Sequence, residues 1–206
     1  MSVKVLGIST SPRQNSNSDL LLRQALAGAE SAGAEIEYIS LRDLNIAPCV
    51  ECNSCYKKGA CVVEDDYQML SSKMLESDRL IFATPIFFMT VCAQAKALID
   101  RCQCLWAYKY VLKKPLITTG RDRRAMVIAV GGTKSKKMFD SIRLTAKYFL
   151  DVLEMSYAAN LFVNKIDEPG QIKQHPSAMD EAFRLGRELA STDTPPPDKP
   201  LNVELV

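Results

Sequence analysis

Four cysteines lie within a stretch of thirteen residues, at a spacing that is typical of a metal or cluster site. In the run Cys49-Val50-Glu51-Cys52-Asn53-Ser54-Cys55 a thiol recurs at every third residue, and Cys61 follows. Thiolates are soft ligands that select Zn²⁺, Cu(I) or iron–sulfur clusters. The compact spacing favours a four-iron, four-sulfur cluster, whose ligands occur in such runs. Zinc, which more often uses two separated C-x2-C pairs, and a set of reduced or disulfide-forming thiols are the other two interpretations.

A second candidate site is the polar loop from Ser9 to Ser18, which is dense in hydroxyl and amide side chains. It follows a short apolar run, and an amphipathic helix follows it, with Ser18 as the expected N-cap. Backbone N–H groups, the helix dipole and Arg13 would together favour a phosphate. The loop has neither a G-x-G-x-x-G nor a P-loop pattern, so it fits a terminal monophosphate better than a dinucleotide. The alternative is a helix cap in a solvated turn, since caps use the same residues.

Two further loops follow apolar runs. One is Thr84-Pro85-Ile86-Phe87-Phe88, where a proline and two aromatics form an apolar lip that would support a planar ring. Aromatics at the start of a helix are more often part of the core, so this lip is weak evidence by itself. The other loop begins with Gly131-Gly132.

The elements that position these loops alternate between strand and helix. The strands are expected at residues 3–8, 36–39, 80–83, 125–130 and 157–163. The helices are expected at residues 18–29, 65–75, 93–106, 135–150 and 177–190. This alternation predicts an α/β fold, a three-layer sandwich with a five-stranded parallel sheet. Ligands bind at the carboxyl ends of such strands, so the loops at Ser9, Thr84 and Gly131 should converge. FMN has the phosphate tail and the flat ring that would occupy all three.

Composition sets the limits of these interpretations. The chain has 206 residues, 47% of them apolar and 24% charged, which is enough for one domain with a sizeable core. We expect that domain, with its cysteine loop at 49–61, to span residues 1–190, followed by an extended tail at 191–206. A net charge of +2 implies no strong field for nucleic acid or an acidic membrane. No apolar run is long enough to span a membrane, and no signal region is evident. We therefore expect a cytoplasmic protein with no membrane partner. In that reducing compartment, seven cysteines indicate metal or redox chemistry rather than structural disulfides.

The chain resembles the iron–sulfur flavoproteins, which belong to the NADPH-dependent FMN reductase-like group of flavodoxin-like folds. The motifs that carry the resemblance are Gly7-Ile8-Ser9-Thr10-Ser11-Pro12-Arg13, the four-cysteine run, and Thr84-Pro85-Ile86-Phe87-Phe88 with Lys96 and Asp100-Arg101. It covers residues 1 to about 190, and the cysteine run is its most specific part. One departure is Thr10, where many relatives have a glycine, and a side chain there affects the closest approach of the backbone to a phosphate.

The resemblance implies one FMN and one [4Fe–4S] cluster per subunit, in a homodimer or homotetramer where the two approach across a subunit contact. It implies cluster ligands at Cys49, Cys52, Cys55 and Cys61. It implies phosphate contacts at Ser9, Ser11, Arg13, Ser16 and Ser18, and flavin-ring contacts at Pro85, Ile86, Phe87 and Phe88. The remaining candidates for cofactor binding lie in the same three loops and are Pro12, Asn17, Thr84, Gly131 and Gly132.

We assign no catalytic acid or base. His175 is the only histidine and is expected at the surface, which argues against a Ser-His-Asp triad. Cys92, Cys102 and Cys104 are expected to be buried as small apolar residues. The basic stretch from 108 to 124 is expected to be a solvated connection, with a lid or a docking patch for an anionic electron donor as the alternative.

Three functions compete. The first is an oxidoreductase that transfers electrons between a cluster and FMN, with a redox partner such as ferredoxin or NAD(P)H. The second is an NAD(P)H-dependent FMN or quinone reductase without a cluster. The third is a thiol or zinc module without enzymatic activity, which would bind no flavin.

Overall fold

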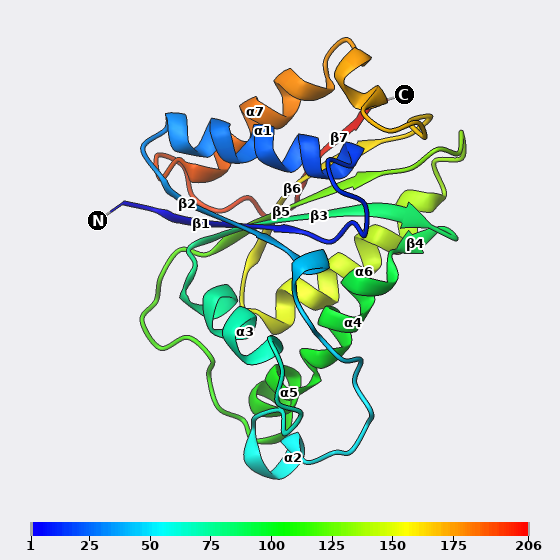
Figure 1. Ribbon diagram of the computed structural model, residues 1–206. Helices are drawn as coiled ribbons and strands as arrows, with labels where there is room; N and C mark the ends of the chain where they lie inside the picture. The colour runs from blue at the N-terminus through cyan, green and yellow to red at the C-terminus, as the bar shows by residue number, and fades with distance from the viewer. Residues whose placement is uncertain (1, 206) are drawn as a thin grey trace.

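A sheet of parallel strands forms the middle layer of the structure, a computed structural model that describes residues 2–205 (Figure 1). The strands lie in the order β2-β1-β3-β5-β6-β7, and the two-residue strand β4 pairs antiparallel with β3 alone. The strands are β1 (Lys4–Ser9), β2 (Glu35–Ser40), β3 (Arg79–Phe87), β4 (Thr90–Val91), β5 (Arg124–Val130), β6 (Ser156–Val163) and β7 (Leu201–Leu205). The order along the sheet reverses between β1 and β3, which makes the carboxyl ends of these strands the expected ligand site.

The prediction of five parallel strands was one strand short, because β7 pairs in parallel with β6. Its residues fall in the stretch that the sequence analysis assigned to an extended tail. Asn202 and Glu204 interrupt the apolar pattern of β7, as suits a strand at a half-exposed edge.

Helices cover both faces of the sheet, as expected. Figure 1 shows α1 and α7 on one face, and α3, α4, α5 and α6 on the other. The α-helices are α1 (Asn17–Ser31), α2 (Cys55–Lys58), α3 (Tyr67–Glu76), α4 (Ala93–Arg101), α5 (Gln103–Trp106), α6 (Met138–Val152) and α7 (Ala178–Ala190). The other helical turns are η1 (Leu41–Asp43), η2 (Ala107–Val111) and η3 (Gln171–Gln174). The helix predicted over 93–106 is divided at Cys102, where α4 ends and α5 begins.

Two apolar cores follow from the alternation of side chains along the strands. Val5 and Ile81 point to the face covered by α1 and α7. Leu6, Leu80 and Phe82 point to the face covered by α3, α4 and α6. Both faces of the central strands are therefore buried, which explains why those strands are nearly continuous apolar runs.

Helices α1 and α7 touch through two glycines. A Cβ atom on Gly28 would lie 2.0 Å from the carbonyl oxygen of Phe183, and one on Gly186 would lie 1.9 Å from that of Ala25. No real Cβ tolerates such distances, so this crossing requires glycine on both helices. The contact fixes the direction of α1, and α1 in turn presents its N-terminus to the β1 loop.

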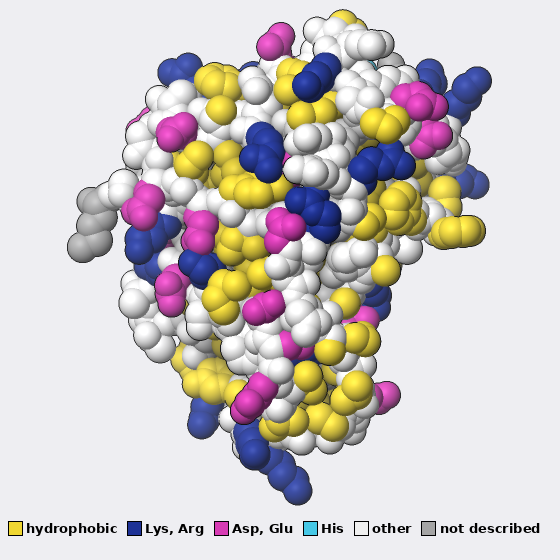
Figure 2. All heavy atoms as spheres, viewed as in Figure 1, with side chains coloured by type: hydrophobic (Ala, Val, Ile, Leu, Met, Phe, Trp, Pro, Cys, Tyr) yellow, Lys and Arg dark blue, Asp and Glu magenta, His cyan; other side chains and the backbone are white. Residues whose placement is uncertain are grey.

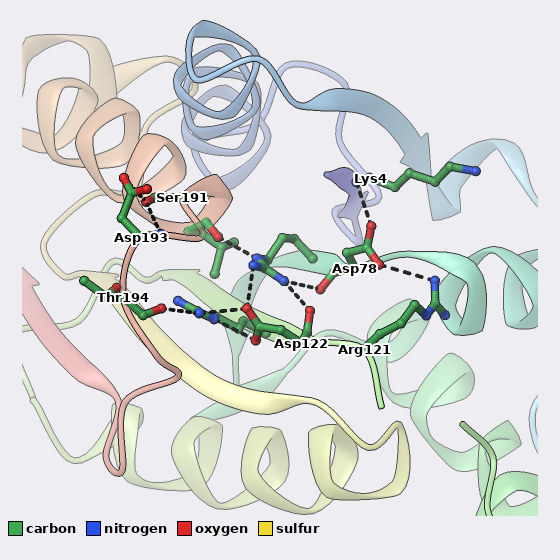
Figure 3. A network of polar contacts seen from close by, with 10 residues as sticks. Lys4, Asp78, Arg121, Asp122, Ser191, Asp193 and Thr194 are labelled. Atoms are coloured by element: carbon green, nitrogen blue, oxygen red, sulfur yellow. Dashed lines mark hydrogen bonds and ion pairs between the residues drawn. The ribbon is translucent and has the colours of Figure 1, made fainter. Parts of the chain in front are cut away.

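At the amino-terminal ends of β3 and β5, the buried Arg79 and Arg124 bind Asp122, which Figure 3 labels. Arg79 donates from Nη2 to the Asp122 carboxylate at 2.9 Å and from Nε to the Leu189 carbonyl at 2.7 Å. Arg124 binds the same carboxylate at 2.7 Å and also donates to the Thr194 carbonyl. The chain that leads from α7 to β7 is thus fastened to the sheet by the same network.

Among residues 2–205, no helix combines the length and the apolar character that crossing a bilayer requires.

Candidate functional site

The β1–α1 loop buries its hydroxyl groups and exposes its charged tip. Ser9, Ser11, Ser16 and Ser18 are all buried, whereas Pro12 and Arg13 are exposed. The expected N-cap at Ser18 is wrong, because Ser16 caps α1 and its Oγ accepts from the Asp19 N–H at 3.2 Å. Ser16 is the N-cap because its backbone is extended, as a cap requires, whereas Ser18 already lies in the first turn of the helix.

Thr10 does not obstruct the loop. Its side chain is fully buried, and its Oγ1 donates to the Ala83 carbonyl and lies 3.3 Å from the Cys92 Sγ. The Cys92 thiol donates back to the Thr10 carbonyl at 3.1 Å. The side chain that replaces the usual glycine therefore faces the interior and ties the loop to β3 and to the start of α4.

The Asn17 side chain has a structural task. Its Nδ2 donates to the Glu168 carbonyl at 2.9 Å, and its Oδ1 accepts from the Ile172 N–H at 3.2 Å. These bonds hold the chain that follows β6 beside the first turn of α1. The side chain of Asn17 is thereby engaged within the protein, and its backbone N–H lies in the first turn of α1.

The predicted apolar lip is a β-hairpin. Strand β3, predicted to end at Ala83, continues to Phe87 and turns back into β4. Phe88 and Met89 form the turn with φ of 47° and 65°, and Phe88 is fully exposed. Positive φ at both central positions belongs to a two-residue turn that favours Asn or Gly, so these bulky residues are strained there. The tip of the hairpin is therefore a strained aromatic residue that projects into solvent.

The remaining residues predicted to bind the cofactor also lie at the carboxyl ends of the strands. Thr84 is buried, with its Oγ1 3.4 Å from the Cys92 N–H, and Pro85 and Ile86 are half-buried. A Cβ on Gly131 would lie 3.3 Å from the Ile86 Cβ, and one on Gly132 would lie 3.0 Å from the Asp167 carboxylate. The loops after β1, β3 and β5 therefore adjoin, as predicted. The site fits a phosphate and a flat ring: buried hydroxyls, a helix N-terminus and a nearby apolar hairpin.

The cysteine segment lies farther from the sheet, on the face that α3, α4, α5 and α6 cover. Figure 1 shows the chain after η1 running past α4 to α2, beyond the helix layer. Cys49 and Cys52 are exposed. Cys55 and Cys61 are half-buried and pack against the core on the face covered by α3, α4 and α6. In Figure 2, hydrophobic side chains gather over this lower end of the molecule.

All four cysteines line one open cavity of about 520 Å³, whose other walls include Arg101 and Tyr148. Within residues 2–205, however, no three Cys, His, Asp or Glu side chains are gathered as ligands of a single metal ion. Zinc needs four ligands about one point. An iron–sulfur cluster is larger, and its thiolates surround a volume. Four free thiols around one cavity therefore fit a cluster in number and kind.

The thiol environments differ. Burial raises the pKa of Cys55, and the neighbouring Cys104, Cys52 and Cys49 thiols add to this effect. Hydrogen bonding to Ser54 lowers the pKa of the exposed Cys52.

A buried ion pair closes the base of this cysteine loop. The Arg101 and Asp65 side chains are 0% and 5% exposed and meet at 2.6 Å. Arg101 also donates to the carbonyls of Ala47 and Val63, both at 2.9 Å, and so joins the residues that flank Cys49 and Cys61. Asp65 accepts from the Ala47 and Tyr67 N–H groups, each at 2.9 Å. The two stems of the loop are therefore held together by one pair of side chains.

The buried ion pair between Asp65 and Arg101 was not predicted from the sequence. In the sequence, Asp65 stands at the start of an expected helix and Arg101 belongs to a motif of the resemblance, and neither position indicates a buried charge. The available signal was an arginine at the last position of an otherwise apolar helix face, which points it into the core.

The other sequence expectations are met in part. Cys92, Cys102 and Cys104 are buried, as predicted. His175 is half-buried, and its Nδ1 accepts from the Ser177 and Ala178 N–H groups, so it caps α7.

The basic stretch is partly docked on the protein. Arg121 binds Asp78 at 3.3 Å, and Lys109 donates to the Asp151 carbonyl at 2.6 Å. The Ile117 N–H donates to the Glu154 carboxylate at 3.1 Å. These contacts give the segment a defined path.

A sequence profile of the NADPH-dependent FMN reductase family matches residues 3–165. An iron–sulfur flavoprotein of Methanocaldococcus jannaschii is 32% identical over 196 residues, which cover 91% of this chain and 96% of the relative. An iron–sulfur flavoprotein of Archaeoglobus fulgidus is 38% identical over 188 residues, which cover 91% and 79%. The solved NAD(P)H:quinone oxidoreductase from Methanothermobacter marburgensis has a TM-score of 0.67 over 94% of this chain and 100% of its own, at 18% identity, which is a likeness of fold.

Proposed function

The chain belongs to the iron–sulfur flavoprotein branch of the NADPH-dependent FMN reductase family, and from that premise we propose that it passes electrons between FMN and a [4Fe–4S] cluster. It is a flavin-dependent oxidoreductase. The cluster is the part that needs support from this chain, since many flavin reductases do without one.

One observation carries the cluster: four free thiols line a single cavity whose loop is closed by a buried ion pair. A loop that is held at its base keeps its ligands together before any iron arrives. In our proposal Cys49, Cys52, Cys55 and Cys61 are the ligands. The exposed Cys49 and Cys52 would let iron enter, and the half-buried Cys55 and Cys61 would shield one side of the cluster from water.

The β1–α1 loop would hold the FMN phosphate through Ser9, Ser11, Ser16 and Ser18 and the first N–H groups of α1. Pro85, Ile86 and Phe87 would lie along the ring system. When bound, a flavin supplies one- and two-electron chemistry and a cluster supplies one-electron chemistry, so the pair connects donors and acceptors of different kinds. We place the protein in the cytosol, with NAD(P)H or a ferredoxin-like protein as the electron partner.

The loops proposed for FMN lie at the carboxyl edge of the sheet, whereas the cysteine cavity lies beyond the layer formed by α4 and α6 (Figure 1). We therefore propose a homodimer or homotetramer in which the cluster of one subunit approaches the flavin of another. The exposed side chains of Leu144 and Tyr148 on α6, 58% and 62% accessible, support such a contact. They lie between the hairpin and the cysteine cavity, because the Ser141 hydroxyl donates to the Met89 carbonyl and Tyr148 lines the cavity.

A second candidate is an NAD(P)H-dependent FMN or quinone reductase without a cluster. It is favoured by the family profile that matches residues 3–165, which is that of NADPH-dependent FMN reductases. It predicts hydride transfer from NAD(P)H and no acid-labile sulfide.

Anaerobic purification followed by iron, sulfide and flavin assays separates the two candidates. Equimolar FMN with about four irons and four sulfides per chain supports the first. FMN without sulfide supports the second.

Two cysteine variants locate the ligands. Cys52→Ala should remove iron and sulfide and keep FMN, because Cys52 is remote from the flavin loops. Cys102→Ala is the matched control, because Cys102 lines the same cavity but donates to the Leu98 carbonyl within its own helix. A cluster that survives Cys52→Ala would contradict the ligand assignment.

A further inference from the structure

Arg101 uses four of its five N–H groups on the cysteine loop. Nη1 donates to the Ala47 carbonyl at 2.9 Å and to Asp65 Oδ2 at 2.6 Å. Nη2 donates to the Val63 carbonyl at 2.9 Å and to Asp65 Oδ1 at 3.1 Å. A guanidinium carries five N–H donors, so these contacts account for all of them except Nε–H.

The Nε–H group is buried and has no partner. Arg101 as a whole is 1% exposed, so water does not replace the missing acceptor. An unpaired buried donor is unfavourable, and more so when the group is charged. A side chain that satisfies four donors with good geometry and leaves the fifth empty indicates an acceptor that arrives later.

The acceptor within reach is the Cys61 sulfur. Arg101 and Cys61 line the same cavity, and Arg101 is the only arginine in its wall. Burial acts to lower the pKa of Arg101, but the Asp65 carboxylate and the neighbouring Cys61 thiol raise it above its ordinary value. Asp65, the partner carboxylate, is already bound through both oxygens and offers Nε nothing further.

We propose that the Arg101 Nε–H donates a hydrogen bond to the Cys61 Sγ when that sulfur is a cluster ligand, and thereby sets the cluster's reduction potential. This inference rests on the proposed function. Reduction adds one electron to the cluster, taken in the experiment from dithionite, and increases the negative charge on its sulfurs. A cationic donor at a ligand sulfur stabilises the reduced form and raises the potential. Arg101 is a positioning residue in this account, because it orients one ligand and both stems of the loop.

The first test is a redox titration of the cluster, followed by electron paramagnetic resonance. Arg101→Lys keeps the charge beside Asp65 but lacks the planar fork. We expect the reduction equilibrium to shift about tenfold toward the oxidised form, about 59 mV more negative for a one-electron couple. Arg184→Gln is the control, because it removes a positive charge from a surface ion pair on α7. It should leave the potential unchanged.

The second test needs no substitution. The wild-type protein is produced with ¹⁵N-arginine, or with ¹⁵N-lysine as the control, and the reduced cluster is examined for magnetic coupling to ¹⁵N. Coupling in the arginine-labelled protein alone supports the hydrogen bond. This measurement decides the matter even if Arg101→Lys fails to assemble a cluster.

Failure of this inference is distinguishable from failure of the proposed function. A wild-type protein without iron and sulfide overturns both. A loaded wild-type protein that shows no arginine coupling, or an Arg101→Lys cluster with the wild-type potential, overturns the role of Arg101 alone.

Discussion

Removing the Asp65 carboxylate should destabilise the protein far more than removing any carboxylate from its surface ion pairs. Asp65→Ala leaves the Arg101 cation buried without a counter-charge. It also strips the Ala47 and Tyr67 N–H groups of the acceptors that they reach at 2.9 Å. The loop then loses contacts at both of its stems.

The magnitude follows from the burial of the pair. Its side chains are 0% and 5% exposed, so solvent screens the charges little. Removing one partner of a buried pair costs about 3–5 kcal/mol. An exposed pair contributes at most about 1 kcal/mol. The free energy of unfolding of a domain of this kind is about 5–15 kcal/mol, so the Asp65→Ala variant should fold but with a strongly reduced free energy of unfolding.

The assay is urea unfolding of the cofactor-free chain by circular dichroism. Glu188→Ala, which removes a surface partner of Arg184, is the control and should change the free energy of unfolding by about 1 kcal/mol or less. A loss below about 1 kcal/mol for Asp65→Ala would refute the reasoning, because Arg101 would then have found water or another partner.

A double variant separates charge from packing. Asp65→Leu combined with Arg101→Met removes both charges, and apolar replacement of a buried pair is often neutral or stabilising. The double variant should therefore recover most of the loss. If it stays as unstable as Asp65→Ala, the loss comes from the backbone contacts and not from the orphaned charge.

Three other predictions are independent of the first, and a fourth tests the same ion pair through its pH dependence. Thr10→Val should lower the free energy of unfolding by about 1 kcal/mol, the usual worth of one buried hydrogen bond, as measured by urea titration. Phe88→Gly should raise it by about 1 kcal/mol because glycine relieves the strained turn, while weakening self-association in analytical ultracentrifugation. Gly186→Ala should cost about 1–3 kcal/mol through overpacking at the helix crossing, and an unchanged melting temperature would contradict that close contact. Burial would raise the pKa of Asp65, but the Arg101 and backbone hydrogen bonds lower it below its ordinary value of 3.8, so the carboxylate stabilises the loop above that pH and ceases to do so as pH falls through the lower folded value. Protease cleavage within 48–62 should accordingly be the same at pH 7 and pH 5 and should rise only below about pH 4.

Local patterns were sufficient for most of the elements. Apolar runs located β1, β3 and β5, whose residues are almost all buried, and also the shorter apolar stretches of β6 and of the edge strand β2. The spacing of the four cysteines predicted that they share one site, because ligands close in sequence lie on one loop, and all four line the same cavity. The three ligand-binding loops converge because parallel strands bring their carboxyl ends to one edge.

What the sequence did not predict depends on contacts between distant residues. Asp65 and Arg101 are charged, and no local pattern shows that two charges will be buried together. Strand β7 alternates apolar and polar residues over only five positions after a proline-rich segment, and it pairs with the free edge of β6. The turn at Phe88 runs against local preference, and such violations gather at functional surfaces.

The pairing of β7 has a consequence for biosynthesis. On the ribosome, β6 is complete well before Leu201 emerges, so its outer hydrogen-bonding edge faces water during that interval. An open edge invites pairing with a strand of another nascent chain. The contact between Arg124 and Thr194 would shorten this interval, because it anchors the incoming segment beside the sheet before β7 arrives.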